Sequence, residues 1–130
     1  MIYLDTSAVV THVTGRPPAA ALGTYLSSDP RERFAISTVG LIETVRNCDK
    51  YGDFPDLLPR LLRDYAELPV TDEIRNSAAF LAKRLRTLDA IHLASAQSLQ
   101  GELTALVTYD RQLARVAREL GLPVAMPGVE

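Results

Sequence analysis

Short apolar runs alternate with longer amphipathic stretches throughout the 130 residues, and this alternation limits the possible folds more than any other feature. The clearest run is Ala105-Leu106-Val107-Thr108, and Met1-Ile2-Tyr3-Leu4 resembles it. Neither run alternates with polar residues, so each is expected to be a strand buried on both faces, as in a parallel sheet. Parallel neighbours need crossover connections, usually helices. The pattern therefore predicts an α/β fold, a three-layer α/β/α sandwich around a mostly parallel sheet.

The remaining elements complete one domain. Further strands are expected at 34–37 and 122–125, with a brief extended segment at 68–70. Helices are expected at 6–14, 19–26, 38–51, 56–66, 71–85, 87–100 and 111–120, and Thr71 and Thr87 are the expected caps of two of them. No repeat, low-complexity segment or linker divides the chain, which predicts a single domain over residues 1–130.

Composition excludes several classes of protein. The chain is 47% hydrophobic and 23% charged, as soluble globular proteins are, and it has no apolar run of the roughly 20 residues that span a bilayer. A secretory signal is not expected, since Asp5 interrupts the first apolar run. The only cysteine, Cys48, cannot form an internal disulfide. We therefore expect a cytoplasmic protein with no membrane partner.

The net charge of −2 permits a nucleic-acid partner without requiring one. All but Lys50 and Lys83 of the 14 basic residues are arginine, whose planar guanidinium suits phosphate oxygens. Neither G-x-G-x-x-G nor G-x-x-x-x-G-K-[ST] occurs, which disfavours a nucleotide-binding role.

Four carboxylates are expected to meet at one edge of the sheet. Asp5 and Asp110 follow strands, and the carboxyl ends of parallel strands share the edge where α/β proteins bind ligands. Glu43 and Asp89 lie on the inward sides of helices next to that edge. Such a group raises its own pKa values unless a cation is present, and oxygen ligands favour Mg²⁺ or Mn²⁺. We interpret His92 as a packed helix residue rather than a metal ligand.

Each carboxylate also has a purely structural interpretation, which the residues alone leave open. Asp5 can cap the helix that follows it. Asp89 lies near a helix N-terminus, where the helix dipole favours an anion. Glu43 can pair with Arg46, three residues further along the same helix.

Four segments carry a family resemblance: Tyr3-Leu4-Asp5-Thr6-Ser7-Ala8, Ser37 to Glu43, Leu88-Asp89-Ala90-Ile91-His92-Leu93-Ala94, and Val107-Thr108-Tyr109-Asp110-Arg111. In order and spacing, from Ile2 to about Pro127, the chain resembles the PIN-domain ribonucleases, and more closely the VapC-type toxins of bacterial toxin–antitoxin pairs. The resemblance implies Mg²⁺-dependent endonucleolytic cleavage of RNA. It also implies a homodimer and a cognate VapB-type antitoxin whose C-terminal segment covers the site.

The resemblance also assigns roles to residues. The acidic positions of the family match Asp5, Glu43, Asp89 and Asp110 as catalytic and metal-binding groups. Thr6 or Ser7, together with Thr108, match its supporting hydroxyls. Four arginines near the predicted edge are candidates to hold RNA phosphates, namely Arg16, Arg46, Arg86 and Arg111. Glu43 is one candidate for the general base, but the sequence does not assign that role.

Two other functions compete with this one. A phosphatase with Asp5 as nucleophile needs a second Asp two residues later, and Ser7 stands there. A catalytically inactive module that only binds a partner protein or RNA stays open, because the presence of four acids does not prove turnover.

Overall fold

The computed structural model describes residues 1–129, which form a five-stranded parallel sheet. The strand order is β3-β2-β1-β4-β5, and every neighbouring pair is parallel. The strands are β1 (Ile2–Leu4), β2 (Phe34–Ser37), β3 (Ala66–Leu68), β4 (Ala105–Val107) and β5 (Val124–Ala125). The chain builds outward from β1 in one direction and then returns to place β4 on its other side. The β1–β4 pair is thus the topological switch point, where open α/β sheets bind ligands.

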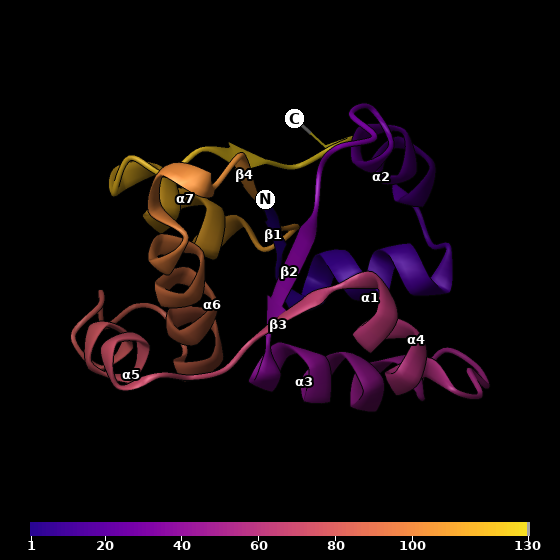
Figure 1. The fold of residues 1–130 in the computed structure, drawn as a ribbon, viewed down its shortest axis with the longest axis horizontal. Coiled ribbons are helices and arrows are strands. Elements are labelled where there is room, and N and C mark those ends of the chain that lie inside the picture. Colours follow the sequence, from indigo (N-terminus) through magenta and orange to yellow (C-terminus); the bar gives the residue numbers. More distant parts are fainter. Residues whose placement is uncertain (130) are drawn as a thin grey trace.

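Helices cover both faces of the sheet, as Figure 1 shows. They are α1 (Thr6–Thr14), α2 (Ala19–Leu26), α3 (Thr38–Cys48), α4 (Leu57–Asp64), α5 (Asp72–Ala79), α6 (Thr87–Ser98) and α7 (Arg111–Glu119), with a short 3₁₀ turn at Gln100–Glu102. The first four lie on one side and the last three on the other (Figure 1). The predicted three-layer α/β/α sandwich is confirmed.

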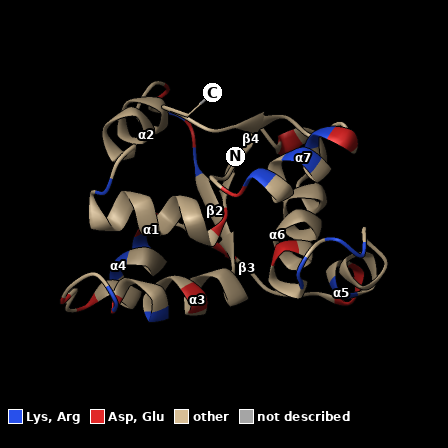
Figure 2. Cartoon of the chain, turned by 180° about the vertical axis from the view of Figure 1, so that it is seen from behind, with Lys and Arg blue, Asp and Glu red and all other residues tan. Residues whose placement is uncertain are grey.

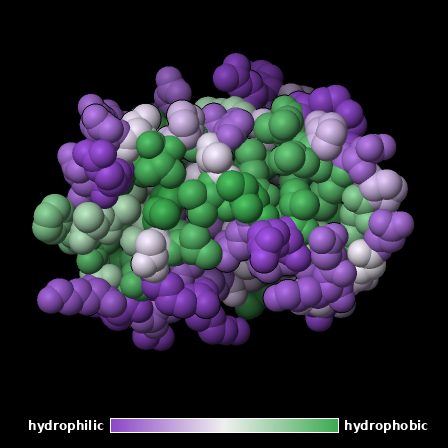
Figure 3. Space-filling model, turned by 90° about the horizontal axis from the view of Figure 1, so that it is seen from below, coloured by the Kyte–Doolittle hydropathy of each residue, from purple (hydrophilic) through white to green (hydrophobic). Residues whose placement is uncertain are grey.

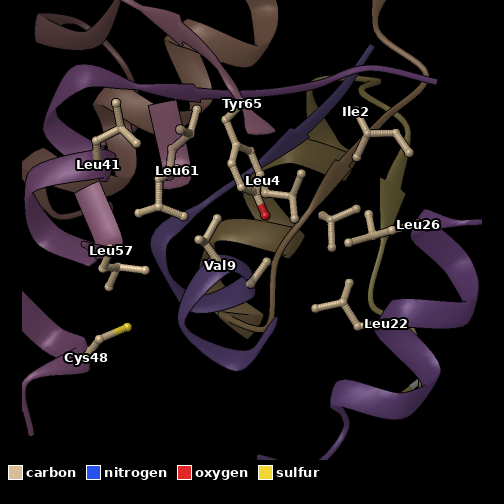
Figure 4. Close-up of a cluster of buried hydrophobic side chains, with 13 residues drawn as sticks. Ile2, Leu4, Val9, Leu22, Leu26, Leu41, Cys48, Leu57, Leu61 and Tyr65 are labelled. Carbon is tan, nitrogen blue, oxygen red and sulfur yellow. The ribbon is translucent and has the colours of Figure 1, made fainter. Parts of the chain in front are cut away.

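Strand alternation divides the core into two clusters. Ile2 and Leu4 of β1 point toward α1–α4, where they pack with Val9, Leu22 and other buried side chains (Figure 4). Tyr3, between them, points to the opposite face, in the cluster of Leu93 from α6 and residues of α7. Because successive strand residues face opposite ways, three apolar residues in a row serve both cores.

Some predicted boundaries were wrong by a few residues. The helix expected at 56–66 ends at Asp64, and β3 begins at Ala66 instead of 68, because Ala66 and Glu67 pair with Ala35 and Ile36 of β2. The helix expected to reach residue 51 ends at Cys48. On α4, Leu57 and Leu61 are buried whereas Leu58 and Leu62 are exposed. This helix therefore carries two leucines that the core does not bury.

The segment after α5 departs most from the expectation. The helix predicted over 71–85 ends at Ala79, although Thr71 caps it as expected. The chain then crosses toward α7, where Arg84 pairs with Glu119 and the Arg84 carbonyl accepts a hydrogen bond from the Gln112 side chain. These long-range contacts outweigh the apolar periodicity that predicted a longer helix.

The cap predicted for the next helix was also wrong. Arg86 is the N-cap of α6 and Thr87 is its first helical residue. The backbone of Arg86 is extended (φ −68°, ψ 159°), and its side chain folds back over the helix N-terminus. Within residues 1–129, no helix is long and apolar enough to cross a membrane.

Candidate active site

A cleft of about 370 Å³ opens at the carboxyl edge of the sheet, between α1, α3 and α6. All four predicted carboxylates line it. Figure 2 shows acidic positions on α3 and α6 on either side of this edge. A larger cleft of about 760 Å³ lies between α1, α2 and α4 and is lined by none of the four.

Asp5 follows β1 and is almost completely buried. Its Oδ1 accepts hydrogen bonds from the Ser7 hydroxyl (2.6 Å) and the Ala8 amide (3.0 Å), so Asp5 caps α1, as its structural interpretation required. Its Oδ2 accepts a bond from the Thr108 hydroxyl (2.6 Å). Burial raises the pKa of Asp5, although His92 and these hydrogen bonds oppose the shift. The fold therefore holds a costly carboxylate at its switch point.

Asp110 follows β4 and caps α7 in the same way. Its Oδ1 accepts bonds from the amides of Gln112 (2.9 Å) and Leu113 (3.0 Å). Two hydroxyls tie this loop to the end of β1: Thr108 bonds both Asp5 and the Asp110 amide, and Ser7 accepts from the Tyr109 amide. These bonds hold the ends of β1 and β4 together. Oδ2 of Asp110 takes no part in them.

Arg86 forms an ion pair with Oδ2 of Asp110 and a second one with Asp89. Its Nη2 lies 3.2 Å from Oδ2 of Asp110, and its Nε lies 3.1 Å from Oδ2 of Asp89 in the first turn of α6. The Arg86 side chain is 79% exposed, whereas the Asp89 side chain is 10% exposed. Proximity to these carboxylates raises the pKa of Arg86, with Asp89 the main cause. A largely exposed cation thus bridges two carboxylates that are mostly buried.

Glu43 of α3 contacts two buried polar side chains beneath the cleft, Thr6 and His92. Its Oε1 accepts a hydrogen bond from the Thr6 hydroxyl and lies 3.8 Å from Nε2 of His92. These contacts, His92 first, lower the pKa of Glu43 despite partial burial. Within residues 1–129 Arg46 is exposed and forms no ion pair, so the predicted structural pairing with Glu43 is absent.

Known proteins resemble this chain in sequence and in fold. The PIN domain family model matches residues 2–119. The chain belongs to the PIN-domain family. It is 40% identical to Ribonuclease VapC47 of Mycobacterium tuberculosis (strain CDC 1551 / Oshkosh), with 98% of each chain covered. It is 37% identical to Ribonuclease VapC35 of the same strain, again over 98% of both chains. Both relatives are named VapC ribonucleases, and the resemblance to VapC-type PIN toxins that the four motif segments carry is confirmed.

The fold is also found in a solved toxin–antitoxin complex from Klebsiella pneumoniae. That chain and this one superpose with a TM-score of 0.73 over 98% of each chain, at 23% identity. The PIN architecture is therefore retained where fewer than one residue in four is the same.

The four arginines suggested for RNA contact divide into two groups in this PIN domain. Arg16 and Arg86 line the cleft, and the Arg16 guanidinium stacks 4.2 Å from the centre of the Tyr51 ring. Arg46 and Arg111 are exposed and lie outside the cleft lining.

The sequence interpretation missed five cleft-lining residues, Val10, Thr11, Asn47, Lys50 and Tyr51, together with Tyr3 behind the cleft. Asn47 follows Glu43 by one helical turn, a spacing that would have signalled the shared face of α3.

The donor set of the cleft suits a hard divalent cation. Its acidic side chains offer carboxylate oxygens, its one histidine, His92, is engaged by Tyr3 and Thr6, and the single cysteine lies in the core away from it. In the part of the chain that the structure describes, no three His, Cys, Asp or Glu side chains are close enough to hold one ion. In this arrangement both oxygens of Asp5 accept internal hydrogen bonds, and Arg86 bridges Asp89 and Asp110.

Proposed function

We propose that this chain is a divalent-metal-dependent endoribonuclease, the toxin of a VapBC-type toxin–antitoxin pair. The observation that carries the proposal is the convergence of Asp5, Glu43, Asp89 and Asp110 on one cleft, from four elements that are far apart in sequence. Relatives named as VapC ribonucleases, matched over nearly their full length, support it.

The carboxylates would divide the work between them. Asp5, Asp89, Asp110 and Glu43 would hold Mg²⁺, or Mn²⁺ in its place, with the Thr6, Ser7 and Thr108 hydroxyls fixing the carboxylate oxygens. When bound, the ion would polarise the scissile phosphate and lower the pKa of the attacking water. Glu43, whose pKa is lowered, is ionised at neutral pH and can accept a proton from that water.

Basic groups around the carboxylates would hold RNA phosphates. Arg16 and Lys50 line the cleft beside Tyr51, a residue that is 49% exposed and whose aromatic ring would stack on a base. Arg86 would leave its carboxylates as the metal binds and turn to a flanking phosphate. Arg46 and Arg111 remain weaker candidates at the periphery.

A cognate VapB-type antitoxin and a second copy of the chain are the proposed protein partners, acting in the cytoplasm. One solved structural neighbour is a toxin–antitoxin complex. Figure 3 shows apolar side chains gathered on the face that carries α3 and α5. Exposed apolar residues near these helices include Ile42 of α3 and Phe80 after α5. Apolar surface of this kind marks protein–protein contact.

The test is cleavage of total cellular RNA by the purified protein, with Mg²⁺ or with EDTA. Asp89→Asn is the site variant, and Asp72→Asn is the matched control, since Asp72 is also a first-turn carboxylate paired with an arginine, but an exposed one on α5. We expect discrete RNA ends that require Mg²⁺ and Asp89 and persist in Asp72→Asn. RNA left intact by the wild-type protein, with Asp89-dependent Mg²⁺ binding retained, would instead favour a module that binds without turnover.

A further inference from the structure

A row of buried hydrogen bonds runs from the backbone of β2 to Glu43. The Ser37 amide donates to the Tyr3 hydroxyl (3.1 Å), and this hydroxyl lies 2.7 Å from Nδ1 of His92. On the other side of the ring, Nε2 lies 3.0 Å from the Thr6 hydroxyl, which donates to Oε1 of Glu43. Tyr3 is fully buried and His92 nearly so, so this row crosses the protein interior beneath the cleft.

The donors and acceptors fix which way each proton points. A tyrosine hydroxyl keeps its proton at neutral pH, since the ordinary pKa of tyrosine is about 10. The Tyr3 oxygen accepts from the Ser37 amide and lies 2.7 Å from Nδ1 of His92, so its proton is placed to bond Nδ1. At the other end of the row the single Thr6 proton goes to the Glu43 carboxylate, so the Thr6 oxygen must accept from Nε2 of His92. A neutral imidazole that accepts at Nδ1 carries its proton on Nε2. Nε2–H then donates to Thr6, and the Thr6 proton goes to Glu43.

Close packing also fixes the position of the His92 ring. A Cβ atom on Gly40 would lie 2.7 Å from Cε1 of His92, so α3 approaches the imidazole at the one residue type that leaves room for it. The Gly40 amide donates to Ser37, whose own amide starts the row. The Tyr3 ring meets the imidazole edge-on, with 5.7 Å between ring centres. The segment from Ser37 to Glu43 thereby supplies both ends of the row and, through Gly40, packs against the ring in its middle.

We propose that Tyr3 and His92 are positioning residues, which act through Thr6 to hold the Glu43 carboxylate in one orientation with one oxygen free for the cleft. The inference rests on the proposed function for its kinetic consequence, but the hydrogen-bond direction stands apart from it. A core role alone would require only that the buried polar groups be paired. A positioning role requires in addition that their protons all point toward Glu43.

The first measurement is ¹⁵N NMR of the His92 side chain in the metal-free protein. We expect a neutral ring with the proton on Nε2 and an unprotonated Nδ1. In Tyr3→Phe, which removes one hydroxyl from a fully buried side chain, we expect the Nδ1 resonance to shift as its hydrogen bond is lost. A proton on Nδ1 in the wild-type protein would overturn the proposed direction.

The second measurement separates kcat from KM on the mapped RNA substrate. His92→Leu is expected to lower kcat by about 10- to 100-fold with KM almost unchanged, as for other residues that orient a catalytic carboxylate. His92→Gln keeps one acceptor and one donor on its amide and should restore most of kcat. Tyr3→Phe should act in the same direction as His92→Leu, and thermal melts confirm that each variant is folded.

The outcomes separate the two proposals. A folded His92→Leu or Tyr3→Phe protein with wild-type kcat would overturn the positioning role. A wild-type protein that leaves RNA uncut would overturn the proposed function, while the NMR measurement would still decide the direction of the hydrogen bonds.

Discussion

Arg86 neutralises two carboxylates at once, so a metal ion must compete with it. Arg86→Gln removes the charge that bridges Asp89 and Asp110. Because the guanidinium is largely exposed and screened by solvent, we expect only about a three- to tenfold gain in Mn²⁺ affinity, measured by isothermal titration calorimetry. RNA affinity should fall in the same variant. Arg84→Gln, which breaks the exposed pair with Glu119 outside the cleft, is the control and should change neither.

Single residues also show what the sequence could and could not reveal. Asp5 and Asp110 were found because each follows an apolar strand, and strand ends share an edge. Their capping and cleft positions are compatible, since one carboxylate oxygen caps while the other faces away from the helix. The Arg86 bridge and the bond from Tyr3 to His92, 89 residues apart, were not found, because long-range pairs leave no periodic signal.

At the scale of elements, the fit of α3 against α6 depends on Gly40. Gly40→Ala would place a Cβ atom 2.7 Å from both the His92 ring and the Ile36 side chain. We expect the free energy of unfolding to fall by about 1–3 kcal/mol, as overpacked cores do. Gly23→Ala in α2 is the matched control, because no atom lies within 4 Å of the added Cβ. It should stabilise the helix by about 0.5–1 kcal/mol. Equal effects in urea unfolding would contradict this account of the α3–α6 contact.

Element types were predictable where local pattern decides them, and boundaries were not where tertiary contacts do. Four of the five strands stand within predicted apolar runs. The start of β3 was predicted two residues too late. Ala66 and Glu67 are exposed and join the sheet through backbone pairing with β2, which an apolar pattern does not reveal. The end of α5 was missed because Arg84 is held by α7.

For the whole molecule, the buried Asp5 links stability to pH. Its pKa is raised in the folded state, so the folded protein binds this proton more tightly than the unfolded chain does. Its contribution is therefore most favourable below the ordinary Asp pKa of about 4 and is lost as the pH rises through the raised value. Glu43, whose pKa is lowered, acts in the opposite direction, with its contribution lost as the pH falls.

Asp5→Asn isolates the first effect, since asparagine also caps helices well. We expect the metal-free variant to be more stable than the wild type at pH 7, by on the order of 1 kcal/mol, with the gap closing toward pH 4. Chemical denaturation across this pH range measures it. A variant that is less stable than the wild type at pH 7 would show that the ionised carboxylate stabilises the fold.

The central claim is that the four carboxylates form one metal-dependent site, and anomalous scattering from Mn²⁺-soaked crystals tests it most directly. We expect a peak in the cleft in contact with Asp5 and Asp89, with Arg86 withdrawn from Asp89. The same peak should be lost in Asp89→Asn crystals. If no anomalous peak lies in the cleft at Mn²⁺ concentrations that support RNA cleavage, the four carboxylates do not form the metal site.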